Sequence, residues 1–175
     1  MSQLSAAFSE RLAAQSGPEQ FQTDEIANLT AAQIKRKINR WIFKETGGTV
    51  QGGPFAGMKL LQEPSWNWND DLSTQLIGCY EQELHHYIEL EIYRLGCLPN
   101  PKIVNIGSAE GYYAIGMARR LPLASVWIVD VSEAALKCAE KIAAANDVTL
   151  HARNPIEMVL AGPDLVICDC EGAET

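Results

Sequence analysis

Basic residues are few in this sequence. It has 14 Lys and Arg against 22 Asp and Glu, which gives a formal net charge of -8. DNA and bulk RNA are bound largely by neutralising phosphates with Lys and Arg. This charge balance therefore argues against a nucleic-acid partner, while it leaves room for a small polar acceptor molecule.

Long apolar runs are also absent. No run approaches the roughly 20 residues that span a bilayer, and the first 17 residues lack the charged start and apolar core of a secretory signal. We therefore expect a cytoplasmic protein without a membrane partner. The cysteine count is odd, and the positions are scattered, which favours reduced thiols over a disulfide framework. No His or Cys pair has the spacing of a zinc site, so we expect no metal. The cysteines are Cys79, Cys97, Cys138, Cys168 and Cys170.

Two regions differ in their apolar pattern. Residues 1–98 are predicted to be a helical N-terminal extension with linker loops, because apolar residues recur at helical spacing over 23–45 and again over 72–95. Asp70 and Asp71 can cap the second of these helices. Residues 99–175 alternate short apolar runs with helical stretches. That alternation predicts an α/β fold with a parallel, Rossmann-like sheet packed by helices, of which four strands fall within the chain.

The segment Asn105–Gly111 begins at the end of the first apolar run of this second region, Ile103–Ile106, and leads into a predicted helix. Gly107 and Gly111 are spaced as G-x-x-x-G, whereas a dinucleotide fingerprint requires G-x-G-x-x-G. The carboxylate of Glu110 is also unfavourable for a pyrophosphate. A cationic or zwitterionic ligand, such as a sulfonium amino acid, suits this turn better.

Asp130 ends the second predicted strand, about 20 residues after the glycine turn, where an acidic residue can accept hydrogen bonds from ribose hydroxyls. The alternative is that Asp130 only caps the following helix, a role that Ser132 can also fill. The occurrence of the turn and the acidic residue together favours ribose binding.

Acidic residues follow the fourth predicted strand, which is Leu165–Cys168. Asp169 and Glu171 could hold a substrate hydroxyl, act as a base or contact the cofactor, and the alternative is a solvated acidic loop. His151, after the third strand, is a second candidate for the base or for an adenine contact. We expect Cys168 to be buried in the sheet.

Several segments together resemble the FkbM-type methyltransferases, a group of class I S-adenosylmethionine-dependent enzymes. The matching segments are Gly53–Met58, Ile77–Leu84, Asn105–Tyr113 and Asp169–Glu174. The resemblance implies methyl transfer from S-adenosylmethionine to a hydroxyl of a sugar or natural product. It also implies a set of cofactor-binding residues: Asn105, Gly107, Ser108, Glu110, Gly111, Tyr112, Asp130, Asp169 and Glu171. Asp169 and His151 are the candidate catalytic residues.

The sequence departs from the resemblance in two places. Many methyltransferases have Asp where this chain has Asn105, and an amide cannot supply charge to the sulfonium. The chain also ends after the fourth predicted strand, while the family sheet continues, so we expect a fragment or a truncated chain. A non-catalytic module that binds adenosyl ligands or mediates oligomerisation therefore stays open as the alternative function. A homo-oligomer also stays open as the assembly of the chain. An NAD-dependent oxidoreductase is disfavoured by the glycine spacing.

Overall fold

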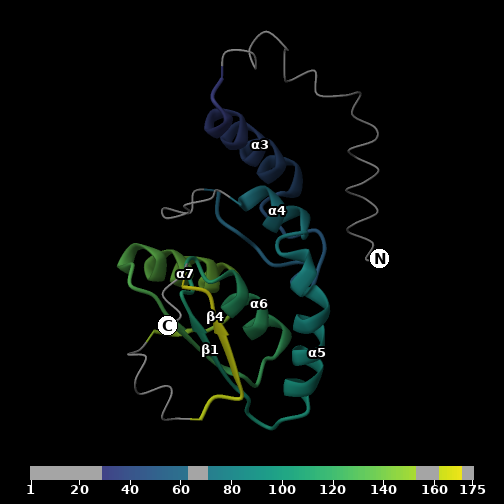
Figure 1. Ribbon diagram of the computed structural model, residues 1–175, viewed down its shortest axis with the longest axis vertical. Coiled ribbons are helices and arrows are strands. Elements are labelled where there is room, and N and C mark those ends of the chain that lie inside the picture. The colour runs from purple at the N-terminus through teal and green to yellow at the C-terminus, as the bar shows by residue number, and fades with distance from the viewer. Residues whose placement is uncertain (1–28, 63–70, 153–161, 171–175) are drawn as a thin grey trace.

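The computed structural model describes residues 29–62, 71–152 and 162–170. In this part of the chain a helical N-terminal region precedes alternating strands and helices (Figure 1). The elements are α3 (Ala31–Thr46), α4 (Leu72–Ile77), η1 (Gln82–Leu84), α5 (His85–Gly96), β1 (Lys102–Ile106), α6 (Tyr112–Arg120), β2 (Ser125–Val129), α7 (Glu133–Ala145), β3 (His151–Ala152) and β4 (Leu165–Cys168). No helix in these ranges is both long enough and apolar enough to cross a bilayer.

The strands of the described part form one parallel sheet in the order β3-β2-β1-β4. Ile106 pairs with Val129 of β2 on one side and with Cys168 of β4 on the other. The chain moves outward from β1 to β3, and β4 then lies on the opposite side of β1, so the strand order reverses between β1 and β4. This is the order of the first strands of a Rossmann-type sheet, and ligands bind beyond the carboxyl ends of the strands at such a reversal. The predicted α/β fold is confirmed.

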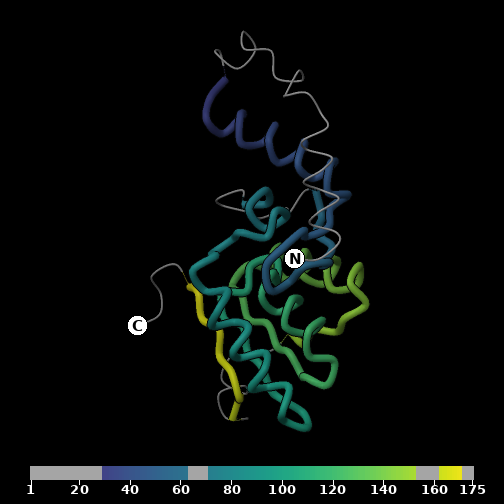
Figure 2. The backbone as a smooth tube through the Cα atoms, turned by 90° about the vertical axis from the view of Figure 1, so that its right-hand side faces the viewer, coloured from purple at the N-terminus to yellow at the C-terminus, as the bar shows by residue number. Residues whose placement is uncertain are grey.

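One face of the sheet packs against α6 and α7. Ile103, Val126 and Ile128 point to this face and are at most 1% exposed. They belong to a core cluster that also contains Ile115 of α6 and Ile142 of α7. Alternate residues of the strands point to the opposite face, where Val166 is 47% exposed. Figure 2 shows β4 at the outer border of the molecule. In β4, Leu165 and Ile167 are half-buried on the face toward the core, whereas Val166 and Cys168 are exposed on the other face.

The helix predicted over 72–95 is wrong as a single element, because it is interrupted after Ile77. Gly78 has a φ of +84° and ends α4, and a Cβ at this position would lie 2.2 Å from the carbonyl oxygen of Gly52. A left-handed residue in such close contact with another backbone segment breaks the helix, although the apolar spacing continues past it. The chain then turns through Glu81 before α5 begins.

Asp71 is the N-cap residue of α4, but its side chain makes no capping hydrogen bond. The Lys35 ammonium of α3 instead donates to Asp71 Oδ1 at 3.2 Å. The predicted side-chain cap is therefore wrong at Asp71, because the carboxylate is used to hold α3 against α4. The α3 helix itself begins with a capping box between Thr30 and Gln33.

The N-terminal region and the sheet share one apolar cluster. The ring of Phe55 is 1% exposed and lies over Gly116 of α6, where an added Cβ would come within 2.4 Å of the ring. Ile42 and Leu76 belong to the same cluster as the strand residues Ile103 and Val126. The segment before β1 is thus packed directly onto the element that follows the glycine turn.

Candidate functional site

The glycine turn after β1 is held by its own backbone. The amides of Gly107 and Ser108 both donate to the carbonyl oxygen of Val129, at 2.8 and 3.1 Å, and the amide of Gly111 donates to the carbonyl oxygen of Ser108 at 2.7 Å. Gly107 and Gly111 have φ angles of +68° and +84°, which a residue without a Cβ adopts readily. The turn is therefore fixed against the end of β2, and most of its amides already donate hydrogen bonds within the protein.

Asp130 joins the turn to the next loop. Its Oδ2 accepts a hydrogen bond from the amide of Ala109 at 2.9 Å, and its Oδ1 accepts one from the amide of Ser132 at 2.8 Å. Ser132 caps α7, since its hydroxyl accepts from the amide of Ala135. Asp130 thus orders both loops at the carboxyl edge, and each carboxylate oxygen retains a lone pair for a ligand donor.

Asp169 follows β4 and lies directly against the turn. Its amide donates to the carbonyl oxygen of Ile106 at 3.0 Å. A Cβ at Gly107 would lie 1.8 Å from the Asp169 carbonyl oxygen. The structure therefore brings together Gly107, Asp130 and Asp169, which the sequence analysis had placed at the ends of three different strands.

Two polar atoms at the turn are buried without a hydrogen-bond partner among the described residues, Asn105 Oδ1 and Ser108 Oγ. Asn105 is 2% exposed, and its Nδ2 donates to the carbonyl oxygen of Ile167 at a long 3.4 Å. A buried polar atom without a partner is costly, and such atoms are few in folded proteins. Asn105 Oδ1 is an acceptor only, so it suits a ligand that carries a hydrogen-bond donor.

Glu110 is buried as well, with 6% exposure. Its Oε1 accepts a hydrogen bond at 3.0 Å from Nε2 of Gln75, which is 4% exposed on α4. Glu110 was predicted at the turn from the sequence, whereas Gln75 was not. No local pattern indicates this contact, because it joins segments that are far apart in the chain.

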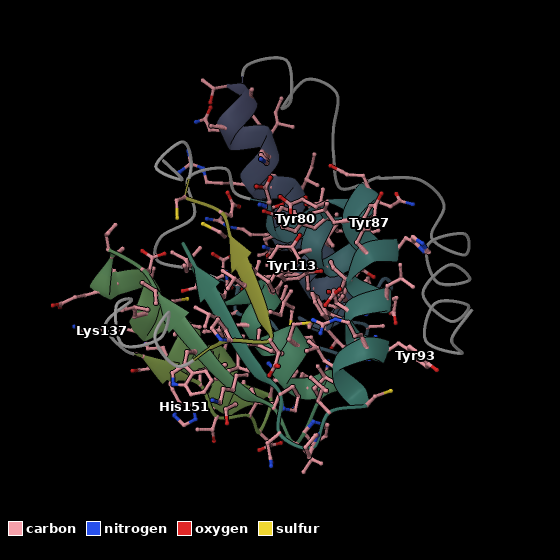
Figure 3. The ribbon with its side chains drawn as sticks, turned by 60° about the horizontal axis from the view of Figure 1, so that its bottom comes forward. Tyr80, Tyr87, Tyr93, Tyr113, Lys137 and His151 are labelled. Carbon is pink, nitrogen blue, oxygen red and sulfur yellow. The ribbon has the colours of Figure 1, made fainter. Side chains whose placement is uncertain are left out.

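Aromatic side chains cover the start of α6 and connect it to the segment before α5. The ring of Tyr112 lies 5.4 Å from both Phe55 and Tyr80 in edge-to-face geometry, and Tyr113 lies 6.3 Å from Tyr80. The Tyr113 hydroxyl donates to Oε2 of Glu81. Figure 3 shows Tyr80 and Tyr113 close together on the same side of the molecule. These residues form a wall beside the turn, which we call the tyrosine wall: Tyr80, Tyr112 and Tyr113.

Burial raises the pKa of all three hydroxyls of the tyrosine wall above the usual range of tyrosine. The hydrogen bond to Glu81 raises the pKa of Tyr113 further, since the carboxylate stabilises the neutral phenol as a donor. At Tyr80, nearby negative charges add to the effect of burial on the pKa, and they come from Glu81, Asp71, Asp169 and Glu110. Tyr80 therefore lies among carboxylates from several elements.

Tyr80 and Glu81 were not predicted as site residues. Both lie in Ile77–Leu84, a segment that was expected to be part of the helix over 72–95 and that also carries part of the family resemblance. Glu81 has a φ of +44°, which is uncommon for a residue with a Cβ and often marks a functional constraint. Such a conformation cannot be recognised from the residue type.

His151 lies away from these residues. It pairs with Trp127 in the sheet, at the level of Val104 rather than at the carboxyl end of β1. Its ring packs against that of Trp127 in a tilted arrangement, with the ring centroids 5.6 Å apart. Strand spacing alone separates β3 from β4 by about 14 Å. Figure 3 shows His151 remote from Tyr80 and Tyr113. The structure does not bring the two predicted catalytic residues, His151 and Asp169, together.

Two further expectations concern the end of the described chain. Cys168 is exposed, so its predicted burial is wrong. The reason is that Cys168 and Val166 point to the face of β4 opposite to the core. Glu171 lies outside the described residues.

The chain shares a segment with one curated relative, the release factor glutamine methyltransferase of Flavobacterium psychrophilum. The two are 42% identical over 69 residues, which is 39% of this chain. This chain is similar to a methyltransferase. It spans 24% of the length of that relative. No protein-family model matches the chain.

Two solved structures also align with the chain. One is the YcgJ protein from Bacillus subtilis, with 20% identity and a TM-score of 0.38, covering 48% of this chain and 37% of that one. The other is a proposed O-methyltransferase from Nostoc punctiforme, with 17% identity and a TM-score of 0.34, covering 69% of this chain and 37% of that one. With TM-scores this low, the fold assignment rests on the strand order of this chain itself.

Proposed function

We propose that the chain binds S-adenosylmethionine at the turn after β1 and belongs to an enzyme that transfers its methyl group. The observation that carries the proposal is the buried acceptor atom Asn105 Oδ1, which has no partner among the described residues. The cofactor has an ammonium group, a positive sulfonium and ribose hydroxyls, so it brings donors and positive charge to a turn that offers acceptors. When bound, it supplies an activated methyl carbon.

The residues of the turn fit this ligand better than a dinucleotide. A pyrophosphate is usually bound by free amides of a glycine turn at a helix N-terminus. Here the amides of Gly107, Ser108 and Gly111 donate to carbonyl oxygens, and the amide of Ala109 donates to Asp130. The Glu110 carboxylate adds negative charge at the same turn. A phosphate would therefore meet few available donors and an unfavourable charge.

Each residue has a proposed part in holding the cofactor. Asn105, Ser108 and Glu110 surround its methionine portion, and Gly107 and Gly111 give the backbone the room to approach it. Asp130 accepts hydrogen bonds from the ribose. Tyr112 supports the turn from the start of α6, where it is packed against Phe55 and Tyr80.

The acceptor that we propose is an uncharged hydroxyl of a sugar or natural product, as the FkbM resemblance implies. Asp169 is the candidate base for this hydroxyl, because it lies against the turn and its side chain is exposed. The carboxylates around Tyr80 disfavour an anionic acceptor such as a phosphorylated sugar. The name of the Flavobacterium relative suggests a different acceptor, a glutamine of a release factor, and this is the alternative to test.

Cofactor binding is tested by calorimetric titration of the 175-residue chain with S-adenosylhomocysteine and, separately, with NAD+. We expect binding of S-adenosylhomocysteine, and stabilisation against unfolding by about 2.7 kcal/mol when its concentration is 100 times the dissociation constant. Asn105→Ala should weaken binding, and the exposed Asp147→Asn should leave it unchanged. Binding of NAD+ without S-adenosylhomocysteine would overturn the proposal.

Methyl transfer is tested separately with labelled S-adenosylmethionine and a panel of neutral hydroxyl acceptors, glutamine-containing peptides and phosphorylated sugars. We expect label on the neutral hydroxyls, and a loss of at least about tenfold in turnover for Asp169→Asn, typical of removing a general base. Asp147→Asn is the matched control. Binding without transfer to any acceptor would instead support the non-catalytic module.

A further inference from the structure

Two thiols flank Asp169. Cys168 is the last residue of β4, and Cys170 follows Asp169. Residues two apart in an extended segment point to the same side, and the two Sγ atoms lie 3.7 Å apart. Cys168 is exposed and Cys170 is half-buried. A pair of neighbouring thiols is therefore accessible to solvent at the edge of the candidate site.

A metal ion does not account for this pair. Soft metals bound by cysteine usually take three or four protein ligands. No group of at least three His, Cys, Asp or Glu residues within 29–62, 71–152 and 162–170 is arranged to hold a metal ion. Two thiols alone are better suited to react with each other.

We propose that Cys168 and Cys170 are a modification site, at which a hydroperoxide forms a reversible intrachain disulfide that alters the candidate site around Asp169. The Cys168 thiolate attacks the peroxide, which breaks the O–O bond and gives a sulfenic acid and hydroxide. The Cys170 thiolate then attacks the Cys168 sulfur, forms the S–S bond and releases a second hydroxide. The two thiols lose two protons and two electrons, and hydrogen peroxide is reduced to two molecules of water.

The geometry requires a small movement for this bond. A disulfide is about 2.05 Å long, so the sulfur atoms must approach by about 1.65 Å from their separation of 3.7 Å. Side-chain rotation and a bend of the intervening backbone can supply this movement. An exposed disulfide is accessible to thiol reductants, so we expect dithiothreitol to reverse it.

The backbone of Asp169 transmits the change to the glycine turn. Its amide donates a hydrogen bond to the carbonyl oxygen of Ile106, and its own carbonyl oxygen occupies the space that a Cβ of Gly107 would need. Closing a ring across Asp169 bends the segment that makes both contacts. We therefore expect the disulfide form to bind the ligand of the turn more weakly than the dithiol form. This effect on the ligand rests on the proposed function, whereas formation of the disulfide does not.

The chemical test treats the reduced 175-residue chain with hydrogen peroxide, blocks remaining thiols with N-ethylmaleimide and analyses peptides by mass spectrometry. We expect the peptide containing Cys168 and Cys170 to lose two hydrogen atoms, to carry no maleimide and to regain both thiols with dithiothreitol. Cys97, which is also exposed, is the internal control and should not form this ring. Alkylation of both Cys168 and Cys170, or their pairing with other cysteines, would overturn the proposal.

The functional test compares S-adenosylhomocysteine affinity before and after oxidation, in the wild type and in Cys170→Ser. We expect a loss of about tenfold or more in the oxidised wild type and no loss in Cys170→Ser. Equal affinities of the dithiol and disulfide forms would overturn the effect on the site. If the disulfide forms but S-adenosylhomocysteine binds neither form, the proposed function fails while the modification site stands.

Discussion

Replacing Gly107 with alanine tests the contact on which the candidate site depends. The residue has a φ of +68°, and its new Cβ would lie 1.8 Å from the Asp169 carbonyl oxygen. Real Cβ atoms essentially never approach within 3.0 Å of such an atom, so the two segments would have to separate by at least 1.2 Å, the difference between these distances. The substitution would thus push the glycine turn away from the end of β4.

Two costs add up in Gly107→Ala. A left-handed conformation costs a residue with a Cβ about 1–2 kcal/mol, and overpacking of a close contact typically costs about 1–3 kcal/mol. We expect the free energy of unfolding to fall by about 2–5 kcal/mol, the sum of these ranges. Equilibrium unfolding in urea, with unchanged slope, measures this loss.

Gly47→Ala is the matched control. Gly47 ends α3 with a φ of +59°, and nothing lies within 4 Å of an added Cβ. This variant should lose only the conformational cost of about 1–2 kcal/mol. If the two variants lost the same free energy within about 0.5 kcal/mol, the contact between Gly107 and Asp169 would not be as tight as described, and the reasoning would be refuted.

Three further predictions follow from the tyrosine wall and from the placement of His151. Tyr113→Phe should lower the free energy of unfolding by about 1–3 kcal/mol, because it leaves Glu81 without its hydrogen-bond donor. The control Tyr93→Phe, at a residue that is 78% exposed, should change this free energy little. Equal losses for the two variants in urea unfolding would contradict the hydrogen bond between Tyr113 and Glu81. Because the pKa of Tyr113 is raised in the folded state, its stabilising contribution should be complete below about pH 10, the pKa of an unfolded tyrosine, and should be lost as the pH rises above that value. Unfolding measured across this range should show a smaller decline in Tyr113→Phe, and identical declines would argue against the shift. His151→Gln should leave S-adenosylhomocysteine affinity within about twofold of the wild type, because the residue packs against Trp127 away from the turn; a loss of tenfold would show that His151 reaches the ligand.

The sequence was sufficient to predict the elements whose signals are local. The strands β1, β2 and β4, the helices that follow β1 and β2, the turn at Gly107 and the position of Asp130 follow from residue type and spacing, and the structure has them close to where they were expected. The carboxyl ends of parallel strands meet at one edge, so the proximity of Asp130 and Asp169 to the turn also followed.

Contacts between distant segments could not be predicted in this way. The break at Gly78 depends on the approach of Gly52, and the hydrogen bond of Gln75 to Glu110 joins positions 35 residues apart. His151 was misplaced for a related reason. It was expected after the third strand, but it is the first residue of β3. Its register with Trp127 sets its level in the sheet, and register cannot be read from the sequence of a single strand.

The position of Phe55 over Gly116 also bears on how the chain is synthesised. Phe55 leaves the ribosome long before the helix that covers it, because α6 begins only at Tyr112. Until then its apolar ring has no Gly116 to pack on, and the loop around it is exposed to other chains. Partly folded chains with exposed apolar surface of this kind are prone to aggregation. The N-terminal region therefore cannot complete this part of its packing until α6 has emerged.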